Sequence, residues 1–172
     1  MIEIPFEGGC RCQAIRYRCS AAPFVAYTCH CLECQRITSS AFATCIHVPV
    51  ESFAVITGSP NANERISDSG NRLTTSFCGA CGSALFVDNS ARTRMRTVMV
   101  GTIDRAQDIE VSAHIWTSRR LPWSCCPRII GFSRKGVTGD RIMHMTQLDL
   151  RAKLAFFTPS RPNPLVRSAT VA

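Results

Sequence analysis

Three clusters of cysteine residues are the features of this sequence whose types and spacing could do chemistry. They have the spacings C-x-C, C-x-C-x2-C and C-x2-C, and they consist of Cys10 and Cys12, of Cys29, Cys31 and Cys34, and of Cys78 and Cys81. Thiolates that bind zinc tetrahedrally have Zn–S bonds of about 2.3 Å, which places the sulfurs roughly 3.8 Å apart, and neighbouring residues on a bent backbone can supply that spacing. We therefore expect two zinc ions per chain, one in a closed site and one in an open site.

The total of eleven cysteines also bears on where the protein works. A disulfide scaffold is typical of small secreted proteins, but residues 1–7 carry neither the basic nor the apolar segment of a secretory signal. No apolar run of the sequence is long enough to cross a bilayer. We therefore expect a soluble cytoplasmic protein whose paired cysteines bind metal or carry out chemistry.

The positive charge of the chain is concentrated near its C-terminus. The formal net charge is +8, yet residues 1–124 hold 12 Arg and 10 Asp or Glu, a net charge of only +2, and residues 125–172 hold the remaining +6. We therefore predict a zinc-binding domain over residues 1–124 and a basic extension over residues 125–172. A basic surface can bind nucleic acid or another acidic partner, so the extension keeps that alternative open.

The pattern of the first 124 residues predicts an all-β domain with one or two short helices. Apolar and polar residues alternate over residues 14–20 and 94–103, as in half-buried strands. Residues 61–71 are polar and are predicted to form a loop. Further strands are expected at residues 24–28, 42–48, 52–57, 73–77, 83–87 and 109–116.

The C-terminal extension has a different pattern. Apolar residues recur at helical spacing over residues 140–157, Asp140 could serve as the N-cap, and Pro159 follows directly. This pattern is compatible with an amphipathic helix. Residues 158–172 are rich in Pro, Ser and Arg and are predicted to be disordered.

The middle cysteine cluster should lie where a strand passes into a helix. In extended backbone, residues i and i+2 face the same way, so Cys29 and Cys31 can converge on one ion while His30 points to the other side. His30 is therefore expected behind the ligands or at the surface. A short helix at residues 33–40 would direct its backbone amides at the thiolates and favour their ionised form. Residues 78–82 are predicted to cap a hairpin in which Gly82 supplies a positive φ.

Several conspicuous side chains are interpreted as structural. Free thiols in apolar strands behave as small hydrophobic residues, which is our expectation for Cys19 and Cys45. We expect Trp116 and Trp123 to lie in the core or in a pocket wall, and the single histidines His47 and His114 to be packed or solvated.

Taken together, the motifs resemble the glutathione-dependent formaldehyde-activating enzyme family, which also contains centromere protein V. The resemblance extends over roughly residues 5–123. It rests on Gly8-Gly9-Cys10-Arg11-Cys12, Cys29-His30-Cys31-Leu32-Glu33-Cys34-Gln35-Arg36, Phe77-Cys78-Gly79-Ala80-Cys81-Gly82-Ser83, His114-Ile115-Trp116 and Ser118-Arg119-Arg120-Leu121-Pro122-Trp123.

The resemblance implies a β-tent fold of packed antiparallel sheets with two zinc sites. By position, the family's structural site is matched by Cys10, Cys12, Cys78 and Cys81, and its catalytic site is matched by Cys29, Cys31 and Cys34. The chemistry of the residues agrees with this division, because four thiolates complete a tetrahedral shell whereas three leave a position for water or substrate.

The resemblance also implies an activity and a partner. The family joins formaldehyde to the thiol of glutathione, giving S-(hydroxymethyl)glutathione, a reaction classed in reverse as that of a carbon–sulfur lyase. The partner would be glutathione or a related small thiol. Arginines suit its carboxylates; Arg36 is closest in sequence to the open site, and Arg119 and Arg120 belong to a matching motif.

The sequence departs from the family pattern in two places. Gln13 stands where the family usually has glycine after the second cysteine, and the basic extension replaces a short acidic, proline-containing end. The extension supports a second hypothesis, a zinc-stabilised binding module in which both metals are structural and the extension engages nucleic acid or an acidic partner. The three-cysteine cluster favours the enzyme.

Overall fold

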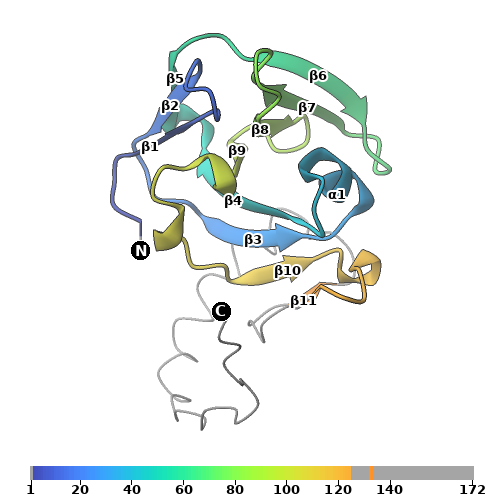
Figure 1. Cartoon of the computed structure of the whole chain (residues 1–172). Coiled ribbons are helices and arrows are strands. Elements are labelled where there is room, and N and C mark those ends of the chain that lie inside the picture. Colours follow the sequence, from blue (N-terminus) through green and yellow to red (C-terminus); the bar gives the residue numbers. More distant parts are fainter. Residues whose placement is uncertain (1, 125–131, 134–172) are drawn as a thin grey trace, which may run out of the picture.

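The computed structural model describes residues 2–124 and 132–133, which form two β-sheets and one α-helix (Figure 1). The smaller sheet has the order β1-β2-β5, with β1 (Phe6–Gly9), β2 (Arg16–Cys19) and β5 (Phe53–Thr57). The predicted all-β class is confirmed. The helix predicted at residues 140–157 and the basic extension lie outside the described residues, apart from β11 (Phe132–Ser133).

The larger sheet has the order β11-β10-β3-β4-β9-β8-β7-β6. Its neighbouring strands are antiparallel, except that β10 runs parallel to both β3 and β11. Besides β11, its strands are β3 (Val25–Cys29), β4 (Ala43–Pro49), β6 (Asn61–Ile66), β7 (Arg72–Phe77), β8 (Ala84–Asn89), β9 (Met95–Met99) and β10 (Ala113–Ile115).

Short helical segments connect the strands. The α-helix α1 (Leu32–Thr38) follows β3, close to the predicted position. The 3-10 turns are η1 (Val50–Ser52), η2 (Val100–Thr102), η3 (Ala106–Asp108) and η4 (Thr117–Arg119). Over the part of the chain that is described, no helix has the length and apolar composition that crossing a membrane would require.

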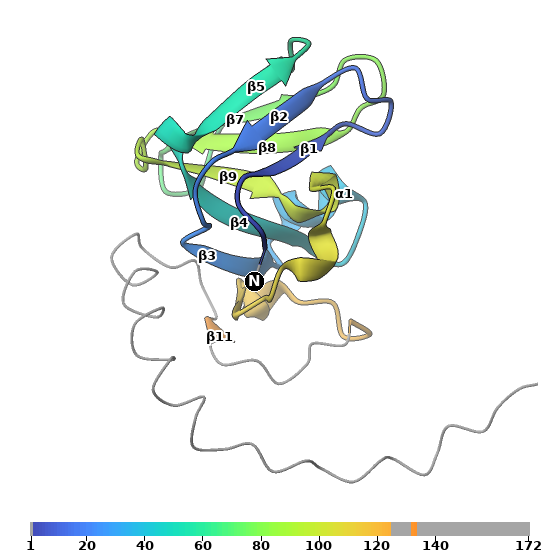
Figure 2. The same ribbon diagram turned by 90° about the vertical axis from the view of Figure 1, so that its left-hand side faces the viewer.

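The main hydrophobic core lies between the two sheets (Figure 2). Tyr17 of β2 stacks on Phe53 of β5 with ring centroids 4.9 Å apart, and both belong to one buried cluster with Ile46, Leu85 and Val98 of the larger sheet. Successive side chains of a strand point to opposite faces. The residues adjacent to Ile46, Leu85 and Val98 in sequence therefore point to the other face of the larger sheet.

A second buried cluster forms on that other face. It contains Tyr27 and Cys29 of β3, Cys45 of β4 and Met99 of β9. Cys45 is buried, as predicted, and its Sγ lies 3.8 Å from the sulfur of Met99. Cys29 therefore reaches the end of β3 with its thiol directed into an apolar layer.

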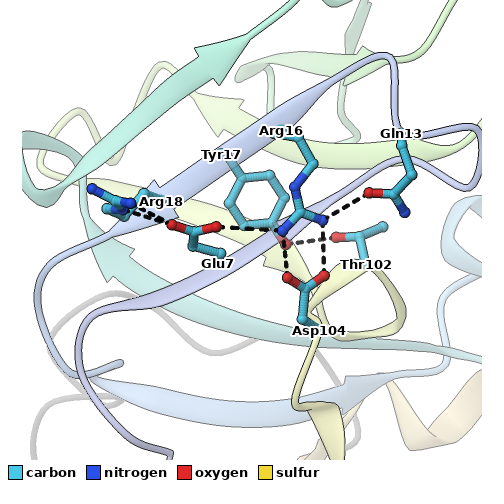
Figure 3. Close-up of polar contacts among 7 residues, drawn as sticks. All are labelled: Glu7, Gln13, Arg16, Tyr17, Arg18, Thr102 and Asp104. Atoms are coloured by element: carbon cyan, nitrogen blue, oxygen red, sulfur yellow. Dashed lines mark hydrogen bonds and ion pairs between the residues drawn. The ribbon is translucent and has the colours of Figure 1, made fainter.

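An ion-pair network fastens the smaller sheet to the segment after β9 (Figure 3). Arg16 of β2 donates to both carboxylate oxygens of Asp104, one at 2.9 Å, and its guanidinium also lies 3.5 Å from the Glu7 carboxylate. The Tyr17 hydroxyl lies 2.8 Å from the Thr102 hydroxyl. These contacts fix the β1–β2 hairpin, whose turn carries the first cysteine pair.

Two predictions about the fold are wrong. Residues 61–66, predicted to be part of a loop, form β6, which pairs with β7 from Asn61 opposite Phe77 to Ile66 opposite Arg72. This edge strand is exposed over most of its length, so its sequence lacks the apolar alternation that marks a half-buried strand. Trp123, predicted to be in the core or a pocket wall, is 74% exposed, because it follows β10 and η4 and no strand directs it inward.

Candidate metal centres

The first and last cysteine pairs meet in one cluster, here called the four-thiol cluster. The Sγ atoms of Cys10, Cys12, Cys78 and Cys81 lie within 4.8 Å of one another. Two of the separations are 3.5 Å, between Cys10 and Cys12, and 3.7 Å, between Cys12 and Cys78. These values are near the roughly 3.8 Å expected for thiolates around tetrahedral zinc. The β1–β2 turn and the β7–β8 turn thus supply a complete set of four sulfur donors.

Left-handed backbone shapes both turns of the four-thiol cluster. Gln13 has a φ of 64°, and its amide donates to the carbonyl oxygen of Cys10 at 3.0 Å. Gly82 has a φ of 74°, as predicted, and its amide donates to the carbonyl oxygen of Cys78 at 2.8 Å. Glycine adopts this conformation without a steric penalty, whereas Gln13 bears the Cβ clash of a left-handed residue.

Hydrogen bonds to sulfur favour the ionised form of two thiols in this cluster, Cys81 and Cys10. Ser83 places its hydroxyl 3.2 Å from the Sγ of Cys81, and with its backbone amide it lowers the pKa of Cys81 to about 5. The backbone amide of Ile15 donates to the Sγ of Cys10 at 3.2 Å, which favours the thiolate there. Amides directed at sulfur are the surroundings that a thiolate-bound metal requires.

The remaining three cysteines form the three-thiol cluster at the junction of β3 and α1. Cys29 ends β3, Cys31 is the N-cap of α1, and Cys34 lies in the first turn of the helix. Their three Sγ atoms lie within 4.8 Å of one another. The Sγ of Cys31 accepts a hydrogen bond from the amide of Cys34 at 3.4 Å, so the prediction that the amide end of this helix faces a thiolate is confirmed.

Mutual contacts dominate the electrostatics of the three-thiol cluster. Contacts with the Cys29 and Cys34 thiols, followed by the amides of Cys34 and Glu33, lower the pKa of Cys31 to about 2. The contact with Cys31 raises the pKa of Cys29 to about 12, and the contacts with Cys29 and Cys31 raise the pKa of Cys34 well above its ordinary value. One thiolate is thus stabilised by two neighbouring thiols, and ionising all three together would require a compensating positive charge.

The two clusters differ in the number of donors. Among the described residues, no further His, Cys, Asp or Glu offers a ligand atom within 4.8 Å of all three thiols of the second cluster. Four thiolates satisfy tetrahedral zinc, and three leave one position for an exogenous ligand. Both donor sets fit zinc, the first as a closed site and the second as an open one.

Apolar side chains surround the three-thiol cluster. Trp116, Ile115, Ala84 and Val87 pack in the same layer as Cys31 and Cys34. Trp116, for which we predicted a core or pocket-wall position, has a φ of 58°, an uncommon conformation for a bulky residue. Strained backbone of this kind often accompanies functional sites. Here the left-handed conformation of Trp116 turns the chain sharply between β10 and η4, beside the thiols.

Three arginines near the three-thiol cluster form ion pairs or hydrogen bonds with other residues of the chain. Arg36 lies 2.8 Å from the carboxylate of Glu33, and Arg65 of β6 lies 4.0 Å from the other oxygen of the same carboxylate. Arg120 donates to the carbonyl oxygen of Ser124 at 3.0 Å. Sequence reasoning missed Arg65, because it lies in the segment predicted to be a loop and reaches α1 only through the fold.

His30 lies behind the thiols rather than among them. Its side chain is fully buried, in accordance with an orientation away from the ligands, and its Nε2 lies 3.1 Å from the Nδ1 of His114. His114, predicted to be either packed or solvated, is packed: its side chain is buried. The Gln35 side-chain amide joins α1 to this region by donating to the carbonyl oxygens of His30 at 2.8 Å and of Arg119 at 3.0 Å.

Comparison with known proteins gives a family match and a likeness to solved structures. A family model described as glutathione-dependent formaldehyde-activating enzyme matches residues 5–119, a span that contains all seven cysteines of the two clusters. No curated protein matches. A crystal structure of a Rhodobacter sphaeroides protein is 20% identical, with a TM-score of 0.49, and the alignment covers 61% of this chain and 96% of that one.

Proposed function

Because the chain belongs to the glutathione-dependent formaldehyde-activating enzyme family, we propose that it joins formaldehyde to the thiol of glutathione and, in reverse, cleaves the adduct as a carbon–sulfur lyase. The observation that carries this proposal is the pairing of a four-thiol cluster with a three-thiol cluster in one small fold. A purely structural metal protein has no need for a donor set that leaves a position open.

Zinc is the metal that suits both donor sets. Cys10, Cys12, Cys78 and Cys81 would hold the structural ion, and Cys29, Cys31 and Cys34 would hold the ion of the reaction site. Zinc with an open position supplies Lewis-acid chemistry and lowers the pKa of a ligand that it binds. Reduced thiols are needed for both sites, which fits a cytoplasmic location.

The reaction is an addition that needs no redox partner. The glutathione sulfur forms a bond to the formaldehyde carbon, and the thiol proton ends on the former carbonyl oxygen, giving S-(hydroxymethyl)glutathione. The protein has to bring the two reactants together in a favourable orientation and to favour the ionised thiol. The buried layer around Trp116 limits access of water to one side of the thiols.

Substrate carboxylates would be recognised by arginines near α1. Arg36 and Arg65 both lie against Glu33, which is adjacent to Cys34 in sequence. An incoming carboxylate can replace Glu33 as the partner of one of these guanidinium groups, and arginine binds carboxylates through a bidentate geometry. A tripeptide thiol with two carboxylates is therefore a better match than an uncharged thiol.

The proposal is tested by measuring the exchange between formaldehyde, glutathione and the adduct at equilibrium. Thiols add to aldehydes without a catalyst, so NMR exchange rates are compared with and without protein. We expect the wild type to accelerate exchange, Cys31→Ala to abolish the acceleration, and Cys45→Ala to retain it, since Cys45 is buried near the three-thiol cluster but is not part of it. No acceleration by zinc-loaded wild type would exclude the proposed reaction.

A further inference from the structure

A network of buried polar side chains lies behind the three-thiol cluster. Thr28, His30 and His114 are 5%, 0% and 2% exposed. The Nε2 of His30 lies 3.1 Å from the Nδ1 of His114 and 3.4 Å from the Thr28 hydroxyl, which also contacts His114. Burying polar groups costs free energy unless they are hydrogen-bonded, and a satisfied buried network makes its surroundings rigid.

The network occupies the reverse side of the strand segment that carries the thiols. Cys29 faces the second buried cluster, so Thr28 and His30 face the opposite way along β3. His114 is the register partner of Thr28 on the parallel strand β10. The thiols and the histidine pair are therefore two sides of one short piece of backbone.

Two elements, β10 and α1, and the residue before β4 hold His30 at once. Its amide donates to the carbonyl oxygen of Ile115 in β10 at 3.0 Å, and its carbonyl oxygen accepts from Gln35 of α1 at 2.8 Å. Its ring meets His114 on one side and the ring of Phe42 at 5.2 Å between centroids. Because His30 is the one residue between Cys29 and Cys31, fixing its backbone and ring fixes the separation of both thiols.

We infer that His114, acting through His30, is a positioning residue for the three-thiol cluster and sets the metal affinity of that cluster. The inference rests on the proposed function, since it takes the cluster to be a zinc site. The four-thiol cluster provides an internal reference, because the Cys10–Cys12 turn is held by its own backbone through the bond from the Gln13 amide to the Cys10 carbonyl oxygen.

The test compares three variants of the full-length chain. His114→Leu removes the ring nitrogens, and His114→Asn keeps a polar atom where Nδ1 lies. Ser112→Ala is the matched control: it removes the 3.0 Å bond from the Ser112 hydroxyl to the Ala26 carbonyl oxygen, a contact between the same two chain segments that does not involve His30. The affinities of the two zinc ions are measured by competition with a chelator, and alkylation followed by mass spectrometry assigns each ion to its cysteines.

We expect His114→Leu to weaken one zinc ion, that of Cys29, Cys31 and Cys34, by about 10- to 100-fold, the range for residues that orient metal ligands. The other ion should be unaffected, His114→Asn should recover most of the loss, and Ser112→Ala should match the wild type. Equal weakening of both ions, or no weakening, would overturn the inference. If His114→Leu does not fold, Thr28→Val tests the same network at nearly constant volume, with a smaller but equally selective loss expected.

A wild type that binds a single zinc ion would contradict the proposed function but still test the positioning role. In that one-zinc protein, the network should keep Cys29 protected, and His114→Leu should accelerate alkylation of Cys29. Cys19, fully buried in the smaller sheet, reports global opening. Acceleration at Cys29 without acceleration at Cys19 would support the inference, and equal rates in the wild type and His114→Leu would overturn it.

Discussion

The Sγ of Cys31 accepts a hydrogen bond from the backbone amide of Cys34 at 3.4 Å, so a residue of the three-thiol cluster is also the N-cap of helix α1. The helix is only seven residues long, and at this length it depends on its ends and on its packing rather than on its own propensity. The cluster and the helix that carries Cys34 therefore stabilise each other.

Replacement of Cys31 by serine or by alanine should separate metal binding from helix capping. Both variants lose one thiol ligand, but serine is a good N-cap whereas alanine is not. We expect Cys31→Ala to be less stable than Cys31→Ser by about 1 kcal/mol. Urea denaturation of both proteins, each with zinc retained at the four-thiol cluster and absent from the three-thiol cluster, measures the difference, and equal midpoints would argue against the capping role.

The four-thiol cluster should determine whether the protein folds. Its ligands come from two turns distant in sequence, and a structural zinc ion contributes its binding free energy to folding. We expect Cys81→Ser, or treatment with a strong chelator, to abolish cooperative thermal unfolding. Without chelator, Cys31→Ser should retain a cooperative transition, because its four-thiol cluster is intact. Similar loss of folding in both variants would contradict the division between the two clusters.

The turn after Cys12 should be more stable with glycine than with alanine. Gln13 has a φ of 64°, which accounts for the glycine usual at this place in the family, and its side-chain oxygen accepts from Arg16 at 3.1 Å. Gln13→Gly and Gln13→Ala both lose that bond, so their comparison isolates the backbone. We expect the glycine variant to be more stable by about 1 kcal/mol in thermal unfolding. The reverse order would mean that the turn is not left-handed in solution.

His47 should make the protein less stable in mild acid. Burial, followed by the charge of Arg92, lowers the pKa of His47 from 6.5 to about 4. Between these values the unfolded chain binds a proton that the folded chain does not, so stability falls as the pH falls through this range. The loss should be about 2 kcal/mol between pH 7.5 and pH 5.

The comparison of wild type with His47→Asn measures how much stability His47 costs the protein in acid. Asparagine can keep the 3.1 Å contact to Thr97 without titrating, and loss of zinc in acid affects both proteins alike. The wild type should therefore lose more stability than His47→Asn between these two pH values. Parallel pH profiles would show that His47 does not carry the effect.

Arg65 should contribute to the choice of thiol. We expect Arg65→Gln to raise the KM for glutathione about two- to fivefold, because the variant loses one partly exposed ion pair with the substrate carboxylate. The rate with 2-mercaptoethanol, which has no carboxylate, should be unchanged. Arg72→Gln is the control, because Arg72 pairs with Glu64 on the same hairpin rather than with Glu33 of α1. An equal effect with both thiols would argue against carboxylate recognition by Arg65.

The three-thiol cluster could be predicted from sequence because its geometry is mostly local. Cys29, Cys31 and Cys34 lie within six residues, and alternation along a strand followed by a helix start is enough to bring them together. The four-thiol cluster needed the family resemblance, since spacing alone does not say which two pairs combine.

The supporting residues could not be predicted in the same way. His114 meets His30 across 84 positions of sequence, through a parallel pairing of β10 with β3 that no local pattern indicates. Arg65 approaches Glu33 only because β6 is an edge strand, and edge strands exposed on both faces carry no hydrophobic alternation. In each case, tertiary pairing rather than local sequence places the residue.

The central claim is that Cys29, Cys31 and Cys34 form an open, ligand-accepting metal site beside a closed one. The most direct test is the zinc content of reduced wild-type protein and of Cys31→Ser, followed by calorimetric titration of each with glutathione. The account predicts two zinc ions in the wild type and one in Cys31→Ser, with binding heat for glutathione in the wild type only. One zinc ion in both proteins, with no heat from glutathione in either, would contradict it.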